Sequence, residues 1–250
     1  MGRLDGKVAL VTGGSRGFGR ATCLAFAREG ARVAINYVQA AREAAEVRDL
    51  IARTGTKGAV YQADVADEAA VERMVKAVVA DFGRIDILVN NSGILVREMF
   101  GQIPVEAWRR MLAVNIDGVL YCTHHVLPVM KANRWGRIIN LTSQLERVGG
   151  PRFAVYSATK GAVHSFTKAL AQELGEFNIT VNNIAPGGIV TDMNRPFFTP
   201  EFMQRRAGEL PVRHLGAPED VATAAVFFAT EEANYFTGQT LYAAGGAVMP

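Results

Sequence analysis

Short runs of apolar and β-branched residues alternate with longer segments of helical pattern along the whole chain. The runs are apolar throughout instead of alternating with polar residues, which is typical of strands buried on both faces of a parallel sheet. Seven such strands are predicted, at Val8–Thr12, Arg32–Asn36, Gly58–Gln62, Ile85–Asn90, Arg137–Thr142, Thr180–Ala185 and Gln239–Tyr242.

Helical segments fill the intervals between these runs. They are predicted near Gly17–Glu29, Ala40–Arg53, Glu68–Phe82, Val105–Ala132, Val155–Phe177 and Glu219–Ala229. The alternation predicts one α/β domain over residues 1–250, with a doubly wound parallel sheet of the Rossmann type, right-handed crossovers and helices on both faces. Ligands of such sheets bind beyond the carboxyl ends of the strands, so we expect the functional residues to gather at that edge.

The composition allows a sizeable core and excludes several classes of function. The chain has 250 residues, of which 49% are hydrophobic. Acidic and basic residues are mixed along the chain, and the net charge is +3. The chain has no basic stretch of the kind that would indicate nucleic-acid binding. No apolar run reaches a membrane span and the N-terminus lacks the core of a signal peptide, so we expect a cytoplasmic protein that does not bind membranes. Cys23 and Cys122 are far apart, which favours free buried thiols in a reducing compartment.

A glycine-rich loop, residues 12–19, lies between the first predicted strand and the first predicted helix and reads TGGSRGFG. Glycines permit a tight turn and let backbone N–H groups approach a pyrophosphate at a helix N-terminus. The spacing differs from the usual GxGxxG fingerprint, and the alternative is a glycine-rich turn without a ligand. The position of the loop favours dinucleotide binding. The expected cofactor contacts in the loop are Gly13, Ser15, Arg16, Gly17, Phe18 and Gly19.

The second predicted strand indicates which dinucleotide binds. A strand that serves NAD usually ends in an acid that holds the ribose hydroxyls. Here it ends at Asn36, an expected cofactor contact without a charge. Arg16 could pair with the extra phosphate of NADP, although it could also be a solvated loop charge. We favour NADP(H), with NAD(H) as the alternative.

Polar residues also follow the third and fourth predicted strands. Asp64, which precedes Val65, could accept a hydrogen bond from the adenine amino group, or it could cap the following helix. Asn91, Ser92 and Gly93 could fix their loop against the cofactor, or they could form a turn of ordinary composition. We expect all five residues to contact the cofactor.

Tyr156 and Lys160 are four residues apart in a predicted helix, so their side chains lie on one face, one turn apart. An ammonium that close should lower the phenol pKa from about 10 towards neutral pH. Such a phenol can donate and accept protons. Ser143 follows the fifth predicted strand, thirteen residues before Tyr156. The Tyr–Lys spacing alone is weak, because surface pairs share it by chance, and its weight comes from the rest of the chain.

Together these motifs resemble the short-chain dehydrogenase/reductase family over nearly the whole chain, from about Lys7 to Met249. Ser92 departs from the usual Ala of the family, but it is small enough to fit. The full set of motifs in this order is specific, although each is modest alone. It comprises the glycine loop, Asn91–Gly93, Asn115, Ser143, Tyr156, Lys160 and Pro186–Gly187.

The resemblance implies a role for each of these residues. Tyr156 would exchange a proton with the carbonyl or alcohol oxygen, and Lys160 would lower the tyrosine pKa and bind the nicotinamide ribose. Ser143 would stabilise charge on the substrate oxygen. Asn115 would hold a water that relays protons to Lys160, and it could also interrupt its helix through local backbone bonds. The resemblance places Pro186, Gly187, Ile189 and Thr191 around the nicotinamide.

Within the family, the bacterial 3-oxoacyl-[acyl-carrier-protein] reductases are the most similar in pattern. Similarity to these reductases implies an oxidoreductase that interconverts a ketone and a secondary alcohol, with a small-molecule substrate that could be an acyl thioester. Arg134 matches a basic residue that would dock the acidic carrier beside the active-site mouth, but Gln172–Phe177 contains two acids and disfavours docking. Alternative substrates are free ketones, polyols, sugars or steroids. An NADP-binding redox sensor or scaffold is an alternative of another class.

Two further segments are predicted to shape the substrate pocket. Glu146 and Arg147 follow Ser143 and could select a polar substrate, or they could form a solvent-facing ion pair. Residues 191–213 lie where the family has a lid, and their aromatic residues could cover the substrate or form a subunit interface. The four histidines show no metal spacing and no acid partner, so no metal site is expected. The resemblance also implies a homotetramer.

Overall fold

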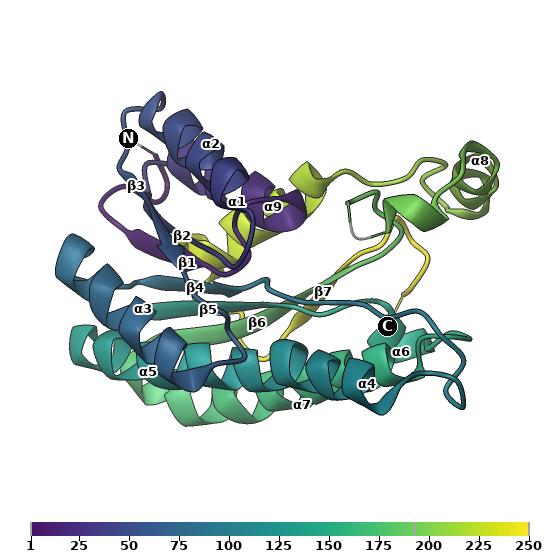
Figure 1. The fold of residues 1–250 in the computed structure, drawn as a ribbon. Helices are drawn as coiled ribbons and strands as arrows, with labels where there is room; N and C mark the ends of the chain where they lie inside the picture. The colour runs from purple at the N-terminus through teal and green to yellow at the C-terminus, as the bar shows by residue number, and fades with distance from the viewer. Residues whose placement is uncertain (1, 193, 250) are drawn as a thin grey trace.

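Seven parallel strands form one sheet in the computed structural model, which describes residues 2–192 and 194–249. Met193, inside the predicted lid, lies outside the described residues. The strand order is β3-β2-β1-β4-β5-β6-β7 (Figure 1). The strands are β1 Val8–Val11, β2 Arg32–Tyr37, β3 Gly58–Gln62, β4 Ile87–Asn90, β5 Gly136–Leu141, β6 Ile179–Pro186 and β7 Thr240–Ala243. The predicted α/β fold is confirmed, and the strand order reverses between β1 and β4, where such sheets bind ligands.

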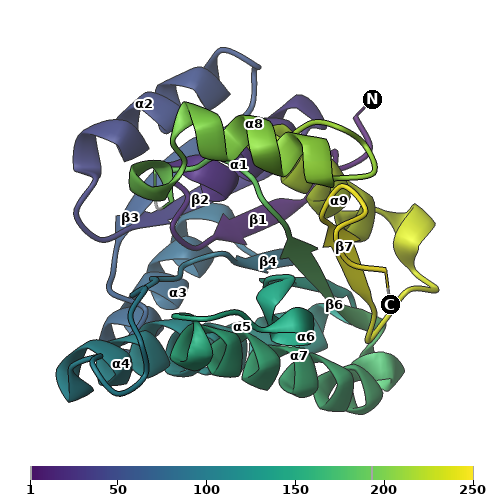
Figure 2. The ribbon, with the colours of Figure 1, turned by 90° about the vertical axis from the view of Figure 1, so that its right-hand side faces the viewer.

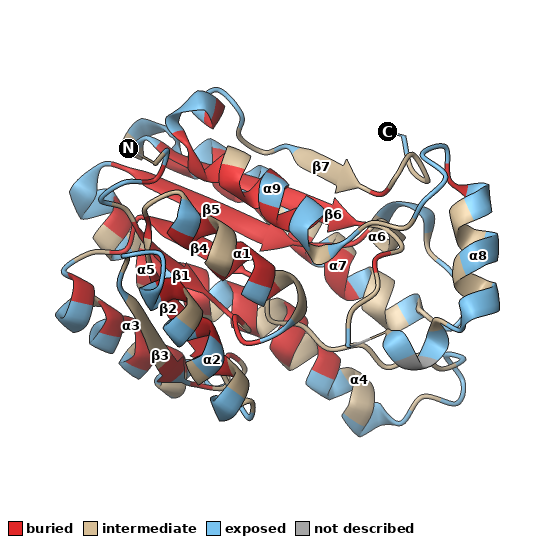
Figure 3. Ribbon diagram, turned by 90° about the horizontal axis from the view of Figure 1, so that it is seen from above, coloured by how far each residue is buried: buried red, intermediate tan, exposed pale blue. Residues whose placement is uncertain are grey.

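Helices cover both faces of the sheet. One face carries α1 Gly17–Arg28, α2 Ala41–Ala52 and α9 Pro218–Ala229 (Figure 1). The other carries α3 Glu68–Phe82, α4 Val105–Leu112, α5 Gly118–Asn133 and α7 Ala154–Leu174. Residues on β1 alternate between the two resulting cores, with Ala9 and Val11 in one and Val8 and Leu10 in the other. This double burial explains why β1 is apolar at every position. Figure 3 shows the buried residues concentrated in the sheet.

Two short helices that the sequence did not predict lie beyond the carboxyl ends of the strands. Helix α6, Leu145–Val148, follows β5, and α8, Pro200–Glu209, follows β6. Figure 2 looks onto this edge, with α8 above and α6 below the ends of β1 and β4. The predicted lid therefore contains a helix, and α8 has no buried residue.

The predicted helix at Val105–Ala132 is interrupted. A π-helical turn, Ala113–Asp117, separates α4 from α5. Such turns are rare and often mark functional sites. Asn115 lies at its centre.

The two cysteines, Cys23 and Cys122, are buried free thiols, as predicted. Among the helices that the structure describes, none combines the length and the apolar character that crossing a bilayer requires.

Candidate active site

Two cavities adjoin at the carboxyl edge of the sheet. The larger, of about 510 Å³, lies between the glycine loop and the ends of β2, β3 and β4. The smaller, of about 350 Å³, lies between the end of β5 and the segment that contains α8. Four residues line both: Phe18, Thr142, Tyr156 and Thr191. Tyr156 therefore lies at the junction of the two cavities.

The conformation of the glycine loop is stabilised by contacts with residues near the ends of neighbouring strands. Asn91 Nδ2 donates to the carbonyl oxygens of Thr12 (2.8 Å) and Gly13 (3.1 Å). A Cβ atom on Gly19 would lie 2.3 Å from the Gly13 carbonyl oxygen, so this position requires glycine. Gly17 has a φ of 52°, in the left-handed region that favours glycine.

The larger cavity fits a dinucleotide. Arg16 precedes α1 and makes no capping hydrogen bond with its side chain, so the N–H groups of the first turn have no side-chain acceptor there. Such N–H groups bind pyrophosphate well. Gly13, Ser15, Arg16, Gly17 and Phe18 all line this cavity, as do Asp64, Val65 and Asn91–Gly93. Gly19 supports the loop instead of lining it.

Asn36 does not lie where its predicted role requires. It is fully buried; its Oδ1 accepts from the Gly13 N–H (3.1 Å) and its Nδ2 donates to the Ala63 carbonyl (2.9 Å). Strand β2 continues to Tyr37, which lines the cavity in its place. Asn36 therefore supports the glycine loop from behind.

For Asp64, the structure contradicts one of the two predicted roles. Its carboxylate accepts from Arg110 Nη2 (2.6 Å) and from the Ala66 N–H (3.0 Å). Asp67, not Asp64, caps α3 by accepting from the Ala70 N–H (3.0 Å). The capping alternative for Asp64 is wrong, and its carboxylate lies on the cavity wall.

Tyr156 and Lys160 lie on the first turns of α7, beside Ser143 at the end of β5. Lys160 Nζ lies 5.7 Å from the centroid of the Tyr156 ring and donates to the Leu141 carbonyl oxygen (2.7 Å). Burial raises the pKa of Tyr156 to about 12, while the Ser143 hydroxyl acts in the opposite direction. Burial lowers the pKa of Lys160 to about 8, against the opposing effect of the Glu146 carboxylate.

The predicted direction of the Tyr156 pKa is therefore wrong: in this structure the pKa is raised instead of lowered. Burial disfavours the phenolate more strongly than nearby groups favour it. Tyr156 is consequently a phenol at neutral pH and can donate a proton. Lys160 titrates near working pH, so the lysine is the group of the pair that can lose and regain a proton there.

Asn115 joins three parts of the site. Its Oδ1 accepts from the Ile94 N–H (2.8 Å), and its Nδ2 donates to the Ile94 carbonyl (3.0 Å) and to Thr159 Oγ1 (3.1 Å). A Cβ atom on Gly93 would lie 3.4 Å from Asn115 Oδ1 and 3.5 Å from Lys160 Nζ, so Gly93 lies beside both polar groups. The π-helical turn thus directs the amide towards the loop after β4 and towards α7, and these contacts are long-range instead of the local bonds considered above.

Comparisons with known proteins agree with this geometry. A family model described as enoyl-(acyl carrier protein) reductase matches residues 13–248. The chain is 42% identical over its full length to the 3-oxoacyl-[acyl-carrier-protein] reductase of Synechocystis, which is covered completely. It is 40% identical over 97% of its length to the Staphylococcus aureus protein of that name, of which 98% is covered. A mutant short-chain dehydrogenase/reductase from Serratia marcescens matches with a TM-score of 0.91 at 37% identity, and 98% of each chain is covered.

The chain belongs to the short-chain dehydrogenase/reductase family. This short-chain dehydrogenase/reductase is an oxidoreductase that acts on a ketone/alcohol pair with a nicotinamide cofactor, as the resemblance implied. In the described part of the chain, no three His, Cys, Asp or Glu side chains gather as a metal site would require.

The structure corrects two expectations about charged residues of this short-chain dehydrogenase/reductase. Glu146 is not part of a solvent-facing pair with Arg147: its side chain is only 2% exposed, lies 2.6 Å from His164 Nδ1 and accepts from the Tyr242 hydroxyl (3.2 Å). His164 therefore has an acid partner, contrary to the prediction. Glu146 joins α6 to α7 and β7, and no spacing in the sequence indicates this contact.

Arg134 also lies away from its expected place. It follows α5 and precedes β5, so it lies at the amino edge of the sheet, opposite the two cavities of its own chain. Its Nη2 donates to the Glu176 carbonyl (2.8 Å). In contrast, Arg97 lines the smaller cavity, and no sequence pattern indicates this role because the loop after β4 has no periodicity.

Proposed function

We propose that this enzyme is an NADPH-preferring reductase of a ketone of the 3-oxoacyl type. The observation that carries the proposal is the position of Tyr156 at the junction of a cavity that fits a dinucleotide and a second, more apolar cavity. The 3-oxoacyl type rests on the names of the similar reductases from Synechocystis and Staphylococcus aureus.

Each residue of the site would have a distinct part in the reaction. The nicotinamide, when bound, supplies or accepts the hydride. Tyr156, protonated at neutral pH, would donate its proton to the carbonyl oxygen, and Ser143 would donate a hydrogen bond to the same oxygen. Lys160, with a pKa of about 8, would return a proton to the site. Asn115 would fix the loop after β4 beside the path by which Lys160 exchanges protons with solvent.

In the larger cavity, the glycine loop would hold the pyrophosphate, and Asp64 would accept from the adenine amino group. Val65, Asn91, Ser92 and Gly93 would line the rest of the binding site. Pro186, Gly187, Ile189 and Thr191 line the smaller cavity next to Tyr156, so they would surround the nicotinamide end.

The preference for NADPH is proposed from the charges at the far end of the larger cavity. Arg16 lines this cavity, as do Tyr37, Val38 and Gln39 at and after the end of β2, and none of these three is acidic. Arg16 is exposed and has no ion-pair partner within the described residues. A guanidinium there can bind the extra phosphate of NADPH, while an acid at the end of β2 would repel it.

Exchange of charge at this end tests the preference. Arg16→Glu and Tyr37→Asp should each lower the ratio of kcat/KM for NADPH to that for NADH by about tenfold or more. Arg20→Glu makes the same charge change one turn further along α1, outside the cavity, and should leave the ratio near its original value. An equal change in all three variants would mean that overall charge, and not Arg16, sets the preference.

The reaction is tested by following NADPH absorbance with a short 3-oxoacyl thioester, with Tyr156→Phe as the variant. We expect turnover in the wild type and a fall of about 100-fold or more in the variant, with NADPH binding retained. Turnover that survives the substitution would refute the role of Tyr156. NADPH binding without turnover of the thioester would move the substrate to free ketones, polyols or sugars.

The enzyme is further proposed to form a homo-oligomer, a tetramer by resemblance. Apolar side chains that a partner could cover are exposed at Leu120 on α5 and at Tyr235 and Phe236 before β7. Light scattering should give a multiple of the 27.0 kDa chain mass. A particle of that single mass at micromolar concentration would contradict the proposal.

A further inference from the structure

The smaller cavity has an unusual combination of wall residues. Aromatic and aliphatic side chains form most of it, including Phe153, Phe197 and Phe202. The two charged residues among its described lining residues are Arg97 and Arg206, and no Asp or Glu is among them. A cavity that is apolar and positive at once favours a ligand that is apolar and negative.

Arg97 lies between two aromatic rings. Its Cζ is 5.3 Å from the centroid of Phe153 and 5.2 Å from that of Phe197. Its Nε is buried without a hydrogen-bond partner. Contacts of this kind restrict a guanidinium while leaving N–H groups at its edge for another partner.

The neighbouring acids are already engaged with other arginines. Glu98, next in sequence, accepts from Arg152 (3.2 Å). Arg206, the other cation of the cavity, donates to Glu209 (3.0 Å). Arg97 itself makes no ion pair with any residue that the structure describes. A charge that is partly desolvated and has no counter-ion costs free energy, and a bound anion would lower that cost.

The position of Arg97 relates this charge to the reaction. Phe153 directly precedes α7, three residues before Tyr156, and the same cavity contains Ser143 and Tyr156. A ligand whose ketone contacts Tyr156 would thus extend along the Phe153 ring towards Arg97. A guanidinium binds a carboxylate through two parallel hydrogen bonds, which fixes both position and orientation.

We propose that Arg97 binds a carboxylate of the substrate, so that the enzyme acts on a keto acid with an apolar body. This inference rests on the proposed function, since Tyr156 must mark the place of the ketone. It narrows that function: a free keto acid is the better substrate, and a neutral ester or thioester lacks the group that Arg97 recognises.

The test compares keto acids with their methyl esters, which differ in charge but share the ketone. Benzoylformate brings an aromatic ring, and levulinate places two methylene groups between ketone and carboxylate. For at least one pair, the wild type should have the higher kcat/KM for the acid. Arg97→Met should lower that value by about 10- to 100-fold, mainly through KM, and change the value for the ester little. Arg97→Lys should restore part of the preference because it restores the charge.

A binding measurement decides the inference even if the probes are turned over slowly. Mandelate, the alcohol that corresponds to benzoylformate, should raise the melting temperature of the wild-type enzyme saturated with NADP more than methyl mandelate does. The difference should vanish in Arg97→Met. Arg152→Met, which removes the contact with Glu98 outside the cavity, is the matched control and should keep both preferences.

Two results separate this inference from the proposed function. If Tyr156→Phe abolishes turnover of acid and ester alike while Arg97→Met leaves their ratio unchanged, the carboxylate inference fails and the reductase stands. If Tyr156→Phe leaves turnover intact, the proposed function fails whatever Arg97 does. Equal binding of mandelate and its ester to the wild type, or no binding of either, would also overturn the role of Arg97.

Discussion

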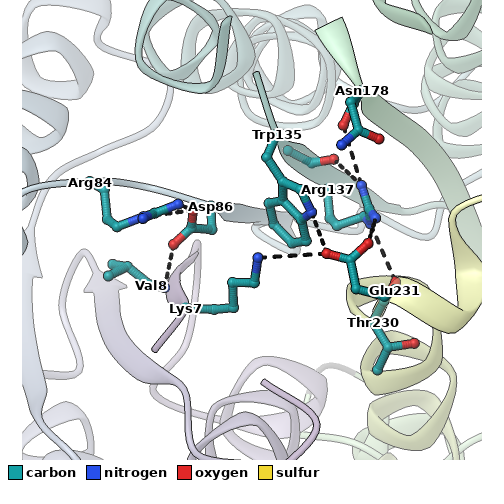
Figure 4. Close-up of polar contacts among 10 residues, drawn as sticks. Lys7, Val8, Arg84, Asp86, Trp135, Arg137, Asn178, Thr230 and Glu231 are labelled. Carbon is teal, nitrogen blue, oxygen red and sulfur yellow. Dashed lines mark hydrogen bonds and ion pairs between the residues drawn. The ribbon is translucent and has the colours of Figure 1, made fainter. Parts of the chain in front are cut away.

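At the amino edge of the sheet, Arg137 is fully buried and its charge is fully partnered, whereas Lys160 and Arg97 at the carboxyl edge have no such set of partners. Arg137 donates to the carbonyl oxygens of Gly136 and Asn178 (2.9 and 3.4 Å) and to Glu231 (3.2 Å). The Glu231 carboxylate also accepts from Trp135 Nε1 (2.6 Å) (Figure 4). Lys160, in contrast, donates to one carbonyl oxygen in the hydrogen bonds that the structure describes.

Asp86, also at the amino edge, likewise finds hydrogen-bond partners for its buried charge within the chain. Its side chain is fully buried, accepts from the Val8 N–H (2.9 Å) and from Arg84 Nε (2.8 Å), and thereby joins β1 to β4 (Figure 4). The comparison teaches that burial of a charge does not by itself indicate function. A buried charge whose partners all lie within the chain is part of the framework, while one with unused donors is available for a ligand or a proton.

Replacement of Lys160 should give the largest effect and separate stability from activity. Lys160→Met should lower kcat by about 100-fold or more, because the proton supply of the site is lost. It should also raise the free energy of unfolding at pH 7 by up to about 3 kcal/mol, since the shift of the lysine pKa from 10.5 to about 8 measures the cost of burying the ammonium. Loss of the hydrogen bond to Leu141 reduces this gain.

The pH dependence of that gain has a definite sign. Because the folded-state pKa is lowered, the burial cost is fully present below pH 8, where the lysine is charged in both states. It decreases as pH rises from 8 towards 10.5. Denaturant unfolding of both proteins across this range should therefore show the stability difference disappearing, and a difference independent of pH would contradict the assignment.

Asp86→Ala should have the opposite result, with stability lost and activity kept. The substitution leaves the Val8 N–H and Arg84 without their acceptor, which should cost about 2–4 kcal/mol of unfolding free energy. Asp67→Ala, which removes only the cap of α3, is the control and should cost about 1 kcal/mol. Urea denaturation measures both, and kcat/KM per folded molecule should not change. Lost activity in folded Asp86→Ala would mean that the amino edge influences the site.

The fold could be predicted because each strand has its own local signal. The run at Val8–Val11 is apolar at every position, and the run at Ile87–Asn90 is apolar at every position but the last; burial on both faces leaves no alternative register that exposes them. The sequence could also predict that the glycine loop, Ser143 and Tyr156 lie close together. All three follow predicted strands, and the carboxyl ends of parallel strands meet at one edge of the sheet.

The features that the sequence could not predict depend on how deeply a side chain is buried and on contacts between segments that are distant along the chain. Whether the Tyr156 pKa rises or falls depends on how deeply the phenol is buried, and the spacing to Lys160 does not contain that information. The sequence predicts a cofactor contact at Asn36 because the predicted strand ends one residue before β2 does, and one residue along a strand turns a side chain to the other face. Arg97 and the Glu146–His164 contact join segments that share no pattern.

Glu146 offers the smallest and most specific test of the comparison. Its buried carboxylate raises the Lys160 pKa against the effect of burial, so Glu146→Gln should move the limb of the pH–rate profile that belongs to Lys160 to lower pH. Glutamine keeps the size of the side chain and can still hydrogen-bond to Tyr242. Glu231→Gln removes the same charge at the amino edge, where the side chain is 63% exposed, and should leave the profile in place. If both variants shift the profile equally, overall charge would explain the effect. If neither variant shifts the profile, the titration of Lys160 does not determine that limb. The difference between the amino and carboxyl edges of the sheet would then rest only on the hydrogen-bond geometry.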